Sequence, residues 1–179
     1  MDEQGLWELI EAARGQVRDP ADAEAVAVRA AALLSAHPPG EIVAAGEVLW
    51  GLLADSYRHP LWAAAYLVNG GCSDDGFEYF RRWLIGQGEA VYTAALRDPE
   101  SLLSVVTSHI GDAAFLRYEG AAFLRFECEL LGNAAVYAYE QKTASEMPHP
   151  PRPQAELIGE DWDDEDLPAM FPRLWAVFE

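Results

Sequence analysis

Apolar residues recur along the chain at intervals of three and four residues, with little of the strict alternation that is typical of a β-strand. Leu6, Ile10 and Ala13 trace one such stripe, and Trp7 lies beside it. Alanine, leucine, glutamate and arginine fill many of the positions between the apolar residues, and all four favour helices. The pattern therefore predicts an all-α protein.

Capping residues, prolines and glycines divide this pattern into separate helices. Asp19 and Asp98 each precede a proline, which places an N-cap residue directly before the first helical position. Pro60 ends one helix and opens the next, because the residue before a proline disfavours helical backbone. Gly70 and Gly86 supply further breaks. We therefore expect one helical bundle of about seven or eight helices.

A long helix is predicted from Asp112 to Thr143. It contains a tandem octapeptide, AAFLRYEG over residues 113–120 and AAFLRFEC over residues 121–128. Eight residues are slightly more than two helical turns, so the second copy is rotated by only about 80° and the helix stays amphipathic. We interpret the repeat as a local duplication within one helix, with a pair of β-strands as the alternative.

The composition changes after residue 145. Seven acidic residues and no basic residue lie between Glu156 and Asp166. Large apolar side chains follow or interrupt this acidic run: Trp162, Leu167, Phe171, Leu174, Trp175 and Phe178. Burial of such groups stabilises a protein by about 25 cal/mol per Å². We therefore expect a helical domain over residues 1–145 and an acidic, proline-rich tail over residues 146–179 that packs back on it.

Charge limits the classes of partner. The 179 residues are 51% hydrophobic, which is enough for one proper core. Asp and Glu number 30 against 12 Lys and Arg, and the net charge of -18 repels nucleic acid and anionic membranes. The two cysteines form no disulfide framework, and the first residues do not resemble a secretory signal. The longest uncharged stretch, residues 60–73, is too short to cross a bilayer, so we expect a cytoplasmic protein.

The segment from Ser73 to Ile85 carries the strongest candidate chemistry. On a helical wheel, Asp74 and Arg81 fall in the same arc as Phe77 and its apolar neighbours, so both charged groups are predicted to point inward. An unpaired buried charge costs several kcal/mol, and each group therefore needs a partner. A separate surface pair, Glu78 with Arg82, is expected from four-residue spacing.

Two interpretations of this segment remain open. In the first, a buried ion-pair network fixes how the helix meets its neighbours. In the second, Arg81 holds an anionic group in a polar pocket with help from the amides of residues 70–73. Glu129, on the inward stripe of the predicted long helix, is the favoured partner of Arg81. The candidate ligand-binding residues are Ser73, Asp74, Asp75, Arg81, Glu129 and Tyr137, and the candidate catalytic residues are Asp74, Asp75 and Arg81.

Spacings typical of metal and cofactor sites are missing from the sequence. It has no His-x-x-x-His or Cys-x-x-Cys pattern, and no glycine-rich phosphate loop. We predict neither a metal nor a cofactor. Cys72 comes just before a predicted helix, a position that lowers thiol pKa values, but no histidine partner is visible in the sequence. A small buried thiol is the alternative to a nucleophile.

Three short motifs follow one another in the middle of the chain: LWAAAY over residues 61–66, SDDGF over residues 73–77 and RRWLI over residues 81–85. In this order they resemble the bacterial family of unknown function DUF4240, which is marked by SDDGF and RGW motifs. Arg82 stands where the family usually has glycine, which leaves Arg81 in place. Shorter similarities, at LWELI near the start, AYEQKT and the final FPRL, extend over nearly the whole chain. The resemblance implies a functional or architectural centre in this region and supplies no activity.

We expect a non-catalytic binding or regulatory module that acts on a protein or small molecule, alone or as a homodimer. It would work through a polar cleft around the SDDGF segment or through its acidic face. The alternative is a small-molecule enzyme in which Asp74 or Asp75 is a general base and Arg81 anchors an anionic substrate. A nucleic-acid mimic built on residues 156–166 is a third hypothesis. An open cavity at Arg81 would favour the enzyme, and a closed, paired cluster would favour the first hypothesis.

Overall fold

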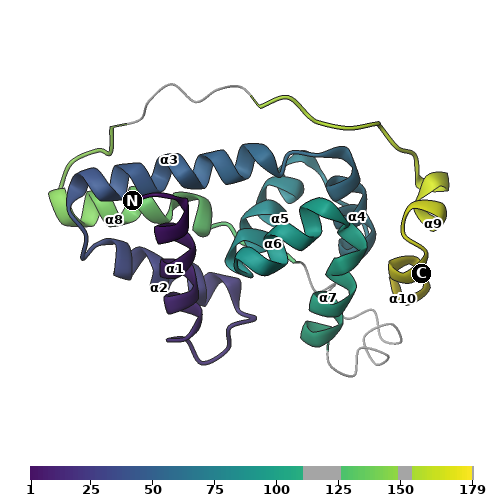
Figure 1. Cartoon of the computed structure of the whole chain (residues 1–179), viewed down its shortest axis with the longest axis horizontal. Helices are drawn as coiled ribbons and strands as arrows, with labels where there is room; N and C mark the ends of the chain where they lie inside the picture. Colours follow the sequence, from purple (N-terminus) through teal and green to yellow (C-terminus); the bar gives the residue numbers. More distant parts are fainter. Residues whose placement is uncertain (111–125, 149–154, 179) are drawn as a thin grey trace.

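The computed structural model of the chain describes residues 1–110, 126–148 and 155–178 (Figure 1). This part of the chain is all-α, as predicted, and forms ten α-helices instead of seven or eight. The helices are α1 (Glu3–Arg14), α2 (Ala23–Leu34), α3 (Pro39–Asp55), α4 (His59–Asn69), α5 (Asp74–Gly86), α6 (Glu89–Arg97), α7 (Leu102–Ile110), α8 (Ala134–Thr143), α9 (Leu167–Met170) and α10 (Pro172–Phe178). Three short 3₁₀ helices join them: η1 (Pro99–Ser101), η3 (Leu131–Asn133) and η4 (Asp164–Asp166).

Most helix ends lie where the sequence predicts them. Ser73 caps α5, since its hydroxyl oxygen accepts a hydrogen bond from the Gly76 amide at 3.2 Å. Gly70, with a φ of 63°, ends α4 in the left-handed region, as expected for a glycine after a helix. The start of α2 was predicted too early. Asp22 is its N-cap, whereas Asp19 forms a preceding turn by accepting from the Ala21 amide.

Two groups of helices meet at α5. In Figure 1, α1, α2, α3 and α8 lie together, and α4, α5, α6 and α7 form the neighbouring group. The long helix α3 passes along both groups, and α5 contacts α2 and α3 from the first group and α4 and α6 from the second. Its side chains Phe77, Phe80, Leu84 and Ile85 are completely buried. The fold therefore places the SDDGF-containing helix at the centre of the core.

The predicted helix from Asp112 to Thr143 is wrong for residues 126–133, whereas its last part, Ala134–Thr143, is helical as predicted. Residues 126–130 have irregular backbone, and α8 begins only at Ala134. The amide of Phe126 donates to the side chain of Asn69, and the amide of Cys128 donates to the carbonyl of Tyr79. These long-range partners on α4 and α5 replace the bonds of a helix. Most of the tandem octapeptide, residues 113–125, lies outside the described residues.

The C-terminal residues pack against α4. Both α9 and α10 contact this helix, and Leu167, Phe171 and Leu174 are buried. An isolated parallel bridge between Arg58 and Ile158 attaches the start of the described tail to the body. The seven acidic residues from 156 to 166 are exposed. The tail thus contacts the body through its apolar side chains, while the division of the chain at residue 145 stays a prediction.

The six tryptophans contribute to the core. Trp7 and Trp83 are buried, and Trp50, Trp62, Trp162 and Trp175 are partly buried and pack against the buried cluster.

Among the helices of the described ranges, none combines the length and the apolar character needed to span a membrane.

Candidate functional site

The first turn of α5 presents its acidic residues to solvent. Asp74 and Asp75 are both exposed, so the prediction that Asp74 points inward is wrong. The helical wheel treats all turns of a helix alike, whereas Asp74 is the first residue of α5, directly after the Ser73 cap, and stays at the surface although Phe77 in the same turn is buried. The two carboxylates lie at the positive end of the helix dipole, where they stabilise the helix.

Arg81 points toward the interior, as predicted, and contacts α3 and two aromatic rings. Its guanidinium donates a hydrogen bond to the carbonyl of Leu53 in the last turn of α3. The guanidinium carbon also lies 4.8 Å from the ring centre of Tyr57 and 5.0 Å from that of Phe77. Carbonyls at helix ends lack partners within their own helix, and cation–π contacts are favourable at these distances. Arg81 therefore joins α5 to the end of α3.

Arg81 keeps its positive charge although it is partly buried. Desolvation lowers the pKa of its guanidinium, and the nearby carboxylate of Glu78 partly raises it again. Arginine remains protonated in proteins. Its buried Nε atom has no hydrogen-bond partner within the described part of the chain. Aromatic faces and one carbonyl thus balance a charge for which we predicted a carboxylate partner.

The predicted pairing of Arg81 with Glu129 is wrong. Glu129 is exposed, and its backbone carbonyl accepts a hydrogen bond from Nη1 of Arg82 at 2.8 Å. Its amide donates to Oε1 of Glu24 at 2.7 Å. The prediction assumed that residue 129 lies on a helix, and the irregular backbone there turns its side chain outward. Arg82 forms the expected ion pair with Glu78.

A row of aromatic rings surrounds the buried side of α5. Ring centroids are 4.9 Å apart between Trp62 and Phe77, 6.4 Å between Phe77 and Phe80, and 5.3 Å between Phe80 and Trp83. Phe126 continues the row at 5.1 Å from Trp83. Aromatic pairs at these separations add stability beyond their buried area. The Phe of SDDGF and the Trp of RRW are therefore core side chains.

The predicted site residues do not all come together. Ser73, Asp74 and Asp75 share the start of α5. Tyr137 lies on α8 with 49% of its surface exposed, and Figure 1 shows α8 at the end of the molecule remote from α9 and α10. Sequence reasoning missed Tyr57 and the Leu53 carbonyl, because a backbone acceptor has no signature in a sequence.

The two cysteines are free thiols in different surroundings. Cys128 is completely buried, and desolvation raises its pKa to about 12. Cys72 is partly buried before the first turn of α5, where its Sγ atom lies 3.8 Å from the carbonyl of Ser73. Over the residues that the structure describes, no three His, Cys, Asp or Glu side chains are grouped so as to hold a metal ion.

A second polar region lies on the tail. Trp162, Asp163, Asp164 and Glu165 line an open surface hollow of about 610 Å³, which we call the acidic hollow. The Trp162 ring packs edge-on against Tyr66 of α4 at 5.2 Å, and the Tyr66 hydroxyl lies 3.4 Å from Oδ2 of Asp164. The sequence predicted solvated acidic residues here but not their placement around an anchored tryptophan.

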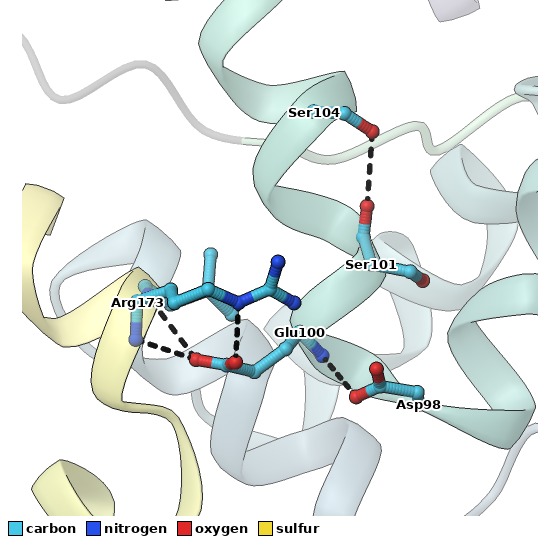
Figure 2. Close-up of polar contacts among 6 residues, drawn as sticks. Asp98, Glu100, Ser101, Ser104 and Arg173 are labelled. Atoms are coloured by element: carbon cyan, nitrogen blue, oxygen red, sulfur yellow. Dashed lines mark hydrogen bonds and ion pairs between the residues drawn. The ribbon is translucent and has the colours of Figure 1, made fainter.

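Figure 2 shows how η1 holds the start of α10. One carboxylate oxygen of Glu100 accepts from the amides of Arg173 at 2.6 Å and Leu174 at 3.3 Å, and the other accepts from Nε of Arg173 at 2.7 Å. Asp98 in turn accepts from the Glu100 amide at 3.0 Å. Burial raises the pKa of the Glu100 carboxyl, but the hydrogen bonds from Arg173 and Leu174 outweigh it, and the net effect lowers the pKa.

Comparison with known proteins identifies a family. Residues 1–141 match the family model described as a protein of unknown function (DUF4240). The match ends within α8, so the FPRL similarity near the C-terminus lies outside it. No curated protein and no solved structure matches the chain. Because the matched residues make up well over half of its length, the chain belongs to the DUF4240 family.

Proposed function

We propose that the protein is a non-catalytic binding module whose partner is a positively charged protein segment. The acidic hollow is the observation that carries this proposal, since it places Asp163, Asp164 and Glu165 around the partly exposed Trp162. Carboxylates attract lysine and arginine side chains, and an indole ring offers them a cation–π contact. The net charge of -18 would further speed the approach of a basic partner.

The contacts of α5 support a binding module over the alternative enzyme. That enzyme requires Arg81 to anchor an anionic substrate, but its guanidinium is engaged by the Leu53 carbonyl and the rings of Tyr57 and Phe77. Asp74 and Asp75 lie at the exposed first turn, where a carboxylate has no enclosed site in which to act as a base. The SDDGF-to-RRW segment is then an architectural centre, and partner binding takes place on the tail.

A basic peptide tests the proposal directly. We would measure binding of a fluorescent octa-arginine peptide to the full chain by anisotropy, at low and at physiological salt. Asp164→Asn with Glu165→Gln should weaken binding roughly tenfold at low salt, because each surface charge contact contributes about 1 kcal/mol or less.

The matched control removes two charges elsewhere. Glu140→Gln with Glu146→Gln neutralises exposed carboxylates in and after α8 and should change the affinity by less than about twofold. Equal losses in the two double variants would mean that the peptide senses only net charge, and the acidic hollow would not be a binding site.

A further inference from the structure

Three buried apolar side chains hold the docked tail on the body. Leu167, Phe171 and Leu174 are 3%, 3% and 0% exposed and are spaced at i, i+4 and i+7. Leu167 lies on α9, Phe171 lies between the two short helices, and Leu174 lies on α10, so each part of the docked tail contributes one anchor. We call the surface of α4 and η1 that α9 and α10 cover the tail-docking surface.

A polar contact identifies the end of this segment. Glu100 accepts hydrogen bonds from the amides of Arg173 and Leu174, and Pro172 before them has no amide hydrogen that needs a partner. The Glu100 side chain is only 13% exposed, whereas that of Arg173 is 59% exposed. With the tail docked, the carboxylate is therefore largely covered, and the tail supplies the complementary charge from a more exposed side chain.

The chain between Met147 and Ile158 connects the tail to the body, and its length bears on whether the tail binds its own chain or a second copy. Met147 is buried, and its methyl group lies close to Gly46 of α3. In the described residues that follow position 154, Ile158 exchanges backbone hydrogen bonds with Tyr57 and His59. The intervening chain can span roughly 36 Å when extended, and Pro148, Ala155 and Glu156 within it are exposed.

We propose that the tail-docking surface also binds the tail of a second copy of this chain, so that two chains exchange tails. Exchange of an identical segment preserves each contact of Leu167, Phe171, Leu174 and Arg173, and it therefore needs no new complementary surface. Docking within one chain dominates at low protein concentration. Exchange becomes populated as the concentration approaches the effective concentration of the attached tail, on the order of millimolar for a short connection.

Mass measurement on the full chain gives the first test. Light scattering should show 19.7 kDa at about 10 μM and a rise toward twice that mass near 1 mM. Deletion of the exposed residues 155 and 156 shortens the reach within one chain and should move this rise to lower concentration. Arg173→Glu places two acids face to face and should keep the chain monomeric over the same range. Monomeric mass at every concentration in both the wild type and the shortened chain would overturn the proposal.

Cross-linking then separates tail exchange from any other dimer. One chain carries Cys72→Ser and Glu100→Cys, the other carries Cys72→Ser and Arg173→Cys, and a short bis-maleimide reagent joins thiols that come together. A mixture should give a cross-linked heterodimer whose yield follows the rise in mass, while a chain with both new cysteines should be cross-linked internally at low concentration. A rise in mass without the heterodimer would place the interface elsewhere and contradict tail exchange.

Discussion

Helix α5 and the acidic tail both contain charged and large apolar side chains, but the surroundings of their charged groups differ. In α5, both arginines bind other groups of the chain. Arg81 donates to the Leu53 carbonyl, and Arg82 pairs with Glu78 and donates to the Glu129 carbonyl. In the tail, the acidic residues from 156 to 166 are exposed, while Leu167, Phe171 and Leu174 are buried against the body.

This difference shows that a charged motif is not in itself a sign of a binding site. A charge that packs against carbonyls and aromatic rings contributes to the fold and is unavailable to a ligand. Charges held at the surface by a well-anchored backbone remain available to a partner. The SDDGF-to-RRW segment belongs to the first kind, and the acidic hollow belongs to the second.

The largest expected effect is in the core of α5. Phe77→Ala should lower the free energy of unfolding by about 4 kcal/mol, because a fully buried ring between Trp62 and Phe80 leaves a cavity when it is removed. Chemical denaturation measures this loss. The half-exposed Tyr137→Ala serves as control and should cost less than about 1 kcal/mol. Similar losses in the two variants would show that α5 is not the centre of the core.

The tail should contribute nearly as much stability through its apolar side. Leu174 is fully buried, and Leu174→Ala should cost about 3 kcal/mol. Val177→Ala, at an exposed position of the same helix, should cost well under about 1 kcal/mol. If the Leu174 variant unfolds at the wild-type denaturant concentration, the tail does not stabilise the body and the comparison with α5 fails.

A smaller loss is expected from the buried charge. Arg81→Ala removes the hydrogen bond to Leu53 and the contacts with two rings, and should cost about 2 kcal/mol. Arg18→Ala removes an exposed arginine and should change stability by about 0.5 kcal/mol or less. Thermal unfolding measures the stability of both variants. Equal melting temperatures would show that the contacts of Arg81 stabilise the fold no more than an exposed arginine does.

The smallest effect depends on pH. Because the folded state lowers the pKa of Glu100, its contribution to stability is present above the unfolded pKa near 4.5 and is lost as the pH falls through the lower folded value. Wild type should therefore melt slightly above Glu100→Gln at pH 7, and the gap should close as the pH falls below about 4.5. A gap that persists or widens in acid would contradict the ion pair with Arg173.

The predictions that succeeded rest on interactions between near neighbours in the sequence. The glycine end of α4 and the pair of Glu78 with Arg82 each involve residues at most four positions apart. Periodicity likewise identified Phe77 and Phe80 as core residues, because a helical stripe is a local property.

The predictions that failed depend on distant backbone groups. Residues 126–129 leave the helical conformation because their backbone binds Asn69, the Tyr79 carbonyl, Arg82 and Glu24. Arg81 meets the Leu53 carbonyl, 28 residues away, instead of a carboxylate. Each of these contacts has a backbone amide or carbonyl on at least one side. Backbone groups are nearly the same in all residue types, so no pattern of side chains could have indicated these contacts.

The carboxylate of Glu100 has a consequence for the last seven helical residues. Pro172 opens α10, and the amides of its first turn are satisfied by a side chain that lies more than seventy positions earlier in the chain. So short a segment has little helical stability in isolation. We therefore expect these residues to become helical only when they contact the body of the protein. Circular dichroism of the isolated peptide should show mostly coil.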